Sequence, residues 1–440
     1  MNSYATAAFD AGRPRPLRTS SWGRLLAPAA IAVAAVGVNL LQACSYTPPA
    51  SLESPEDVYA IIDAAPYVNP TEQQRSVVMD TPGKLHVEHG RSCARANQAA
   101  SETYIGMRIT DNVLLPRGYT GTVYQNGYEL QYEDDDHHVI GLGSAIYNVH
   151  QLGDILFWDA GGVISDHNGD DDYRWCYSYT VVAWPKPATG SPIAPLLPRV
   201  DIEAVHADKT AALIFTDVGS GAVHRIKGVY ESPDRKPRGV LLAGFAASFT
   251  DDDHHLLQLG FDLGRPKLRG RKAKWRSDVV LKDNETRSFR SAELVSILKG
   301  DSVEVFHPSS VLVEGGNETK GVVSNDVRLK PAKAESFCAA VGNTFKRRQV
   351  AVVTPPYTWA MPMLTGWDLR ESCNDQHKRR VGAWIESFSY VRDPGGARGT
   401  LRYTVASAFG DQSPEPFFDR LQVDVLGINL LAGTINVDPD

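Results

Sequence analysis

Two short clusters of aspartate and histidine are the residues of this chain best suited to chemistry. Residues 134–138 and residues 251–255 both read Asp-Asp-Asp-His-His. Carboxylates and imidazoles that lie close together are the usual protein ligands of zinc, manganese and calcium. The pattern therefore indicates calcium or zinc as a candidate cofactor. The candidate ligands are Asp134, Asp136 and His137 in the first cluster and Asp251, Asp253 and His254 in the second.

A second interpretation of the same clusters needs no metal. Consecutive histidines in a strand point to opposite faces, so two neighbouring imidazoles cannot easily reach one ion. An aspartate-rich turn can instead use its carboxylates to accept hydrogen bonds from backbone amides, and the next histidine can pack in the core. Both interpretations stay open at this point.

A further acidic loop follows the first cluster. Asp166, Asn168 and Asp170 place oxygen ligands at alternate positions, as the start of a calcium-binding loop does. The pattern is incomplete, because Asp171 replaces the usual glycine and no glutamate occupies the twelfth position. A solvated turn is the alternative to a calcium site.

An aromatic row comes directly after this loop. Trp175, Tyr177 and Tyr179 alternate along the chain, so their rings share one face of a strand. A face of aromatic rings is what a sugar-stacking site requires. Packing in the protein core is the alternative use of such a row.

The last candidate site is a basic segment, and no motif of a catalytic site is found beside it. Residues 265–276 contain seven arginines and lysines, a composition that suits phosphate-bearing or sulfated polymers. The alternative is a solvated sheet edge, where lysines prevent unwanted strand pairing. Residues 296–299 spell S-x-x-K, but no K-T-G follows, so we predict no catalytic residue.

The elements that carry these residues are duplicated. Residues 122–167 align without a gap on residues 239–284, at a constant offset of 117 positions. The aspartate and histidine clusters coincide in this register, as do Trp158 and Trp275. A third and weaker copy is expected at residues 381–429.

Apolar and polar residues alternate with period two through both copies, and Gly-, Asn- or Asp-rich turns separate the alternating segments. We predict an all-β fold of tandem antiparallel β-sandwich domains with an internal duplication. Ser54 and Pro55 begin a short N-terminal helix. The expected segments are 1–43 (signal peptide), 44–83 (tether and helix), 84–184 (first unit), 185–199 (proline-rich linker), 200–314 (second unit), 315–332 (linker) and 333–440 (divergent third unit).

The N-terminal segment contains an apolar run at residues 25–41 that follows four arginines and ends in Leu-Gln-Ala-Cys at Cys44. It resembles the export signal of bacterial lipoproteins. The resemblance implies cleavage before Cys44, a diacylglyceryl anchor on its sulfur, and a mature chain on the outer face of a bacterial membrane. Ser45 implies the outer membrane in Gram-negative members of this class. An uncleaved anchor or an ordinary secretory peptide is the alternative.

Four further cysteines would then lie in an oxidising compartment, where disulfides form. We favour pairing within units, which joins Cys93 to Cys176 and Cys338 to Cys373, over the two other connectivities and over metal ligation. The part from Cys44 onward has 41 basic and 51 acidic side chains, which gives no reason to expect nucleic acid as a partner.

Taken together, these features predict a membrane-anchored protein of the cell envelope that binds a glycan or an envelope protein without catalysis. The alternatives are a metal-dependent envelope hydrolase, and a structural or assembly lipoprotein.

Overall fold

The structure is a computed structural model, and its described residues all lie in one compact unit, Pro48–Asp440. They are residues 65, 67–81, 84–97, 104–132, 139–166, 172–186, 199–206, 218–219, 222–249, 255–283, 288–309, 311–314, 321–324, 329, 345–371, 378–411 and 417–431. Every regular element among them is a β-strand, so this part of the chain has no helix that could cross a membrane. The predicted all-β class is confirmed, while the predicted N-terminal helix falls outside the described residues.

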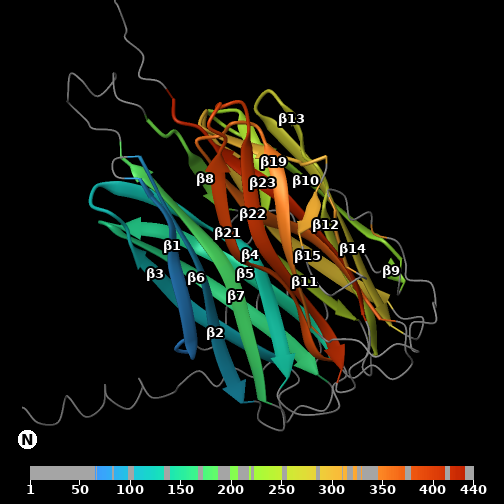
Figure 1. Cartoon of the computed structure of the whole chain (residues 1–440). Coiled ribbons are helices and arrows are strands. Elements are labelled where there is room, and N and C mark those ends of the chain that lie inside the picture. The colour runs from blue at the N-terminus through green and yellow to red at the C-terminus, as the bar shows by residue number, and fades with distance from the viewer. Residues whose placement is uncertain are drawn as a thin grey trace, which may run out of the picture. The chain divides into compact units, whose positions relative to one another are not determined.

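Three packed sheets make up the fold (Figure 1). The first, sheet I, is antiparallel and combines strands from both ends of the chain. In spatial order it contains β1 (Glu72–Thr81), β2 (Leu85–Asn97), β7 (Asp172–Pro185), β4 (Tyr119–Tyr132), β21 (Lys378–Arg392), β22 (Gly399–Asp411), β19 (Phe345–Thr354) and β17 (Leu312–Glu314).

The other two sheets are built in the same manner. Sheet II contains β3 (Tyr104–Leu114), β6 (Ile155–Asp166), β5 (Val139–Leu152), β11 (Pro237–Phe249), β15 (Ser288–Lys299) and β8 (Glu203–His206), with β9 (Val218–Gly219) also on β15. Sheet III contains β10 (His224–Glu231), β14 (Lys272–Asp283), β12 (Leu256–Leu263), β20 (Trp359–Arg370), β23 (Phe418–Ile428) and β16 (Val303–Phe306). Two short strands join sheet III beside this path, β13 (Lys267–Arg269) on β14 and β18 (Gly321–Ser324) on β23.

Each sequence unit contributes four long strands, and these are shared between two sheets. Within a unit the first strand pairs with the fourth, as in β4 with β7, and the second pairs with the third, as in β5 with β6. The first strand also pairs with the second strand of another unit: β4 with β21, β11 with β5, and β20 with β12. Each unit is thus a two-layered sandwich whose layers continue into its neighbours.

The register between units is the same in all three cases. Gly382, Gly143 and Gly260 lie opposite Glu129, Ala246 and Asp368. This register places the start of the third copy at β20. The third copy therefore begins before the expected residues 381–429, with β20 as its first strand and β21 as its second. The sequence signal for its start was weak because the aspartate and histidine cluster has diverged in this copy.

One aromatic residue from each unit meets the others where the inner faces of the sheets come together. The ring centroids of Tyr128, Phe245 and Trp367 lie 4.5 Å (Tyr128–Phe245), 5.0 Å (Tyr128–Trp367) and 4.8 Å (Phe245–Trp367) apart. All three side chains are buried. Because each follows a glycine directly, the same sequence signature that revealed the duplication also builds the centre of the core.

Two segments expected to be a tether and a linker contain strands. β1 forms the edge of sheet I, inside the expected tether at 44–83. β18 pairs in parallel with β23, inside the expected linker at 315–332. Both strands are short of alternating apolar residues, which is the signal that sequence reasoning uses to find a strand.

Candidate functional site

A cavity of about 700 Å³ lies on one face of sheet I. Its lining combines five arginines and three glutamates with two aromatic rings, contributed by both ends of the chain. The charged lining residues are Glu72, Arg75, Arg91, Glu129, Arg174, Arg347, Arg380 and Glu386. We call Arg91, Arg174, Arg347 and Arg380, together with Glu129, the arginine site.

The strand register explains why the face is hollow there. Two neighbouring rows of residues cross sheet I, and both rows contain small residues between long side chains. The first row is Phe345, Ala408, Gly382, Glu129, Cys176, Cys93 and Glu72. The second row is Arg347, Ala406, Trp384, Gly127, Ser178, Arg91 and Gln74. These small residues separate the long side chains of the two rows, and the cavity lies between those long side chains.

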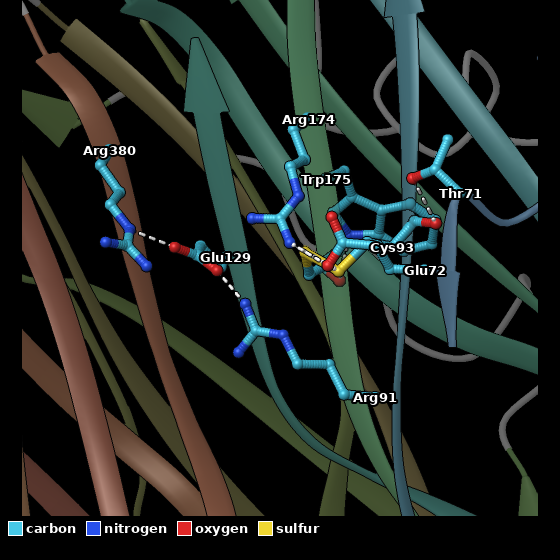
Figure 2. The surroundings of a disulfide bond; sticks show 10 residues. Thr71, Glu72, Arg91, Cys93, Glu129, Arg174, Trp175 and Arg380 are labelled. Atoms are coloured by element: carbon cyan, nitrogen blue, oxygen red, sulfur yellow. Dashed lines mark hydrogen bonds and ion pairs between the residues drawn. A yellow bond between two sulfur atoms is a disulfide. The ribbon is translucent and has the colours of Figure 1, made fainter. Parts of the chain in front are cut away.

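A disulfide joins two strands beside this floor. Cys93 on β2 bonds to Cys176 on β7, with 4.0 Å between the Cα atoms of these directly opposite residues. This confirms the first of the two predicted disulfides. Side chains two positions apart share one face of a strand, so Arg91 and Arg174 lie on the same face as the disulfide (Figure 2).

Glu129 is the anionic centre of the site. Its side chain is 1% exposed, and its two oxygens accept hydrogen bonds from Nη2 of Arg91 and Nε of Arg380 (Figure 2). These three residues come from β2, β4 and β21, and only sheet pairing brings them together. A buried carboxylate of this kind is stable only while its charge remains paired.

Arg174 has donor capacity to spare. Its Nη2 donates to Oε2 of Glu72 over 2.8 Å and lies 3.4 Å from Sγ of Cys93. Its Nε is buried and has no hydrogen-bond partner among the described residues. Buried polar atoms are almost always paired, so this unpaired guanidinium N–H sets Arg174 apart from the other arginines of the cavity.

The arginines lie close enough to repel one another. Burial, followed by the charges of Arg174 and Arg380, lowers the pKa of Arg91 to about 10. Burial and the charge of Arg174 likewise lower the pKa of Arg380 to about 10. Both groups remain cationic at neutral pH, and an added anion would relieve their repulsion.

Two aromatic rings support the guanidinium groups. The Arg91 guanidinium carbon lies 4.5 Å from the ring centroid of Trp384, and that of Arg380 lies 5.0 Å from the ring of Phe345. Arg347 lies 5.5 Å from the same Phe345 ring and donates to Oε1 of Glu386 over 2.7 Å. Such contacts fix the direction of the guanidinium groups at low cost in side-chain entropy.

A neutral histidine lies at the end of the cavity. Nε2 of His89 is 3.2 Å from the carbonyl oxygen of Ile385, and its Nδ1 is 3.1 Å from Oγ1 of Thr180. Burial lowers the pKa of His89 to about 4. The ring is therefore uncharged at neutral pH and ties β2 to β21 across the sheet.

The predicted aromatic row lies elsewhere. Trp175, Tyr177 and Tyr179 are all 0% exposed and point to the opposite face of β7, into the core. The Tyr177 hydroxyl accepts a hydrogen bond from Nε1 of Trp158 at 3.1 Å and donates one to Asp111 at 2.9 Å. The rings are placed as core residues, and they offer no open stacking face in this structure.

Most of the predicted metal ligands fall outside the described residues. These are Asp134, Asp136, His137, Asp251, Asp253, His254, Asn168 and Asp170. The backbone of Asp166 ends β6, opposite Val139. In the described part of the chain no three histidine, cysteine, aspartate or glutamate residues are grouped as metal ligands. The backbone N–H of His255, the last residue of the second cluster, donates to Asp283 on β14 over 3.1 Å, so a carboxylate outside the cluster accepts from this amide.

The remaining predicted cysteines also fall outside the described residues: Cys44, Cys338 and Cys373. Both the lipid anchor and the second disulfide remain predictions.

Sequence reasoning missed the arginine site, although two signals point to it. Arg174 lies two positions before Cys176, and Arg91 lies two positions before Cys93. Glu129 is a single charge between Tyr128 and Leu130 in a buried strand, which marks a residue that needs a partner. The partner Arg380 is 251 positions away, a distance that no local pattern spans.

Comparison with known proteins gives no name to this arrangement. The chain matches no protein-family model, and no curated protein matches it.

Proposed function

We propose that this chain is a lipid-anchored protein of the bacterial cell envelope that binds an acidic ligand at the arginine site without catalysis. The observation that carries the proposal is the cavity on sheet I, which is lined by five arginines and only three glutamates. Arginine binds carboxylate, phosphate and sulfate groups through paired N–H donors. A ligand that carries such a group fits the excess of positive charge.

The chemistry of the cavity narrows the class of ligand. Trp384 is 3% exposed and lies against Arg91, so it offers little surface for a stacked sugar ring. The arginines would therefore recognise the acidic group of the ligand. Of the possible glycan ligands, this cavity best fits an acidic glycan of the envelope. A protein partner would present the same chemistry through an aspartate, a glutamate or a chain terminus.

The proposal that the arginine site binds without catalysis is supported by how its polar groups are used. Glu129 is occupied by two arginines, and His89 is bonded on both ring nitrogens and uncharged. Neither group is free to move a proton to or from a ligand. The metal-dependent hydrolase depends on aspartates and histidines outside the described residues, and the structural or assembly role depends on a partner; both remain alternatives.

Binding to acidic saccharides tests the ligand class. The full-length protein should bind oligosaccharides that contain uronic acid or phosphate, and bind their neutral counterparts at least tenfold more weakly, as measured by titration calorimetry. Arg174→Gln and Arg347→Gln should each weaken binding roughly tenfold, since each removes one charge-assisted contact. Arg398→Gln, an exposed arginine outside the cavity, is the matched control.

Two outcomes would contradict this function. Equal affinity for neutral and acidic saccharides would remove the role of the arginines. A failure to bind any acidic saccharide, together with crosslinking to one stable envelope protein, would favour the assembly role.

A separate experiment tests the location. Cys44→Ser removes the sulfur that would carry the lipid, so this variant should lose incorporation of a labelled fatty acid and leave the membrane fraction. Labelling that persists in the variant would place the anchor elsewhere.

A further inference from the structure

A second charged surface lies on sheet III and takes no part in the arginine site. Strands β10, β14 and β13 lie side by side there, at one edge of the sheet (Figure 1). Alternate residues of β14 are exposed up to Arg276, while Ala273 and Trp275 between them are buried. The exposed positions on all three strands carry mainly lysine and arginine. We call this surface the basic face.

Three cations of the basic face are paired. Arg225 lies 3.2 Å from a carboxylate oxygen of Asp278, and Arg276 donates to the same carboxylate. Lys272 lies 3.0 Å from Glu231. Among the described residues, Asp278 and Glu231 are the only carboxylates on the exposed face of β10, β13 and β14, and both are taken up by these pairs.

Four other cations have no ion-pair partner among the described residues. They are Lys227 on β10, Lys267 and Arg269 on β13, and Lys274 on β14, and all four are exposed. In the strand register, Lys267 lies opposite Lys274 and Lys227 lies opposite Arg276. No ion pair among the described residues neutralises these four charges, so an external anion is their natural counterpart.

The pairing also sets the shape of this surface. Adjacent strands are about 4.8 Å apart, and residues two apart on a strand are about 7 Å apart, so the rows span roughly 10 by 14 Å. The side chains leave the sheet in one direction from three strands. Val229, which is 61% exposed, lies opposite Lys274 within the same surface. A flat group of cations around an apolar side chain matches a layer of anionic headgroups better than a single polymer strand.

We propose that the basic face docks on a lipid surface that bears anionic phosphate headgroups. Lysine and arginine stems are long enough to keep their charge at the headgroups while Val229 approaches the acyl boundary. The proposal goes beyond ligand binding at the arginine site, because it involves a different sheet and different residues. Where a lipid anchor is present, it raises the local concentration of the basic face at the membrane.

Vesicle binding of the full chain tests the proposal. The Cys44→Ser background prevents acylation, and binding is compared between vesicles of phosphatidylcholine alone and vesicles with phosphatidylglycerol added. The measured quantity is the ratio of the two partition coefficients. Because the apolar run at residues 25–41 would raise both coefficients by the same factor, its contribution cancels in this ratio. Each cation near such a surface contributes roughly fivefold to partitioning.

The test variant replaces four charges and has a matched control. Lys227→Gln, Lys267→Gln, Arg269→Gln and Lys274→Gln together should lower the preference for anionic vesicles by roughly 100-fold or more. The control replaces four exposed cations that adjoin strands of sheet I, with the same change in net charge. They are Lys84, Arg117, Lys186 and Arg398, each replaced by Gln. The control should keep most of the preference, and both variants should keep the melting temperature of the parent.

Three results would overturn the proposal. One is the absence of a preference for anionic vesicles in the parent chain. Another is an equal loss of the preference for anionic vesicles in the test and control variants, which would show that net charge alone causes the preference. The third is retention on immobilised dextran sulfate that depends on the four cations while vesicle binding does not, because the basic face would then recognise a polymer.

Discussion

Sheet I and sheet III place different chemistry at equivalent positions of the same framework. In sheet I, Glu129 lies opposite Gly382 and accepts from Arg380. In sheet III, Asp368 lies opposite Gly260 and accepts from Nε2 of Gln258 over 2.7 Å. The carboxylate is kept in both sheets. The residue two positions before the glycine is Arg380 in sheet I and the neutral Gln258 in sheet III, where Arg370 on the same strand as Asp368 supplies the positive charge instead.

The surroundings of the two carboxylates differ as well. Leu329 lies over Gly260 in sheet III, where a Cβ atom added to that glycine would come within 2.7 Å of the leucine side chain. In sheet I the corresponding face is open as the cavity, and β2 adds Arg91 from outside the repeated strands. The repeated strands therefore fix where a charge lies. Strands outside the repeat, such as β2, decide whether that charge becomes part of a binding site.

The largest expected effect concerns the two carboxylates. Glu129→Gln leaves Arg91 and Arg380 close together without their shared anion, and should lower the free energy of unfolding by about 3 to 5 kcal/mol. Asp368→Asn keeps a hydrogen-bonding partner for Gln258 and removes the ion pair with Arg370 alone, so one arginine instead of two loses an ion pair and the change should cost about 1.5 to 3 kcal/mol. Chemical denaturation measures both. Equal losses would show that the two carboxylates contribute equally to stability and would contradict the expected difference between the sheets.

The glycines that precede the central aromatic residues come next. Gly127 has a φ of 140°, and a Cβ there would lie 2.2 Å from the Cα of Trp384. At Gly366 the nearest atom would be the carbonyl oxygen of Phe261 at 2.9 Å. Gly127→Ala should therefore cost about 2 to 4 kcal/mol, and Gly366→Ala clearly less. Thermal unfolding of the two variants, in parallel with the parent, ranks them; the reverse order would contradict the stated geometry.

The smallest effect is a dependence of stability on pH. The pKa of His89 is lowered by burial to about 4 in the folded chain, against about 6.5 when unfolded. The unfolded state therefore binds the proton more readily, so the contribution of His89 is complete above pH 6.5 and falls by up to about 3 kcal/mol as the pH drops to 4. His89→Gln should flatten this part of the stability curve. Burial lowers the pKa of His224 in sheet III as well, so His224→Gln should flatten it in the same direction. An unchanged curve in both variants would assign acid sensitivity to other groups.

Local patterns in the sequence were enough to predict the strands of the repeated units, although not β1 and β18, because alternation and turn residues act over a few positions. They also revealed the duplication and the Cys93–Cys176 disulfide. They could not reveal which unit pairs with which, since β4 and β21 are distant in the chain and meet only through tertiary packing. The alternation of Trp175, Tyr177 and Tyr179 was equally compatible with surface and core, and only the opposing sheet decides that they are buried. The arginine site was missed for the same reason, because its five charges come from five strands: β2, β4, β7, β19 and β21.

The cyclic pairing of the units has a consequence for the order in which the chain can be completed. β4 is synthesised early, yet its edge is covered only when β21 arrives from the third unit. Until then an unpaired strand edge is exposed to other chains, and such edges are templates for aggregation. A shortened chain that lacks the last unit would keep this exposure permanently. Newly made chains therefore depend on rapid completion, or on a helper that shields β4, before the three units can close on one another.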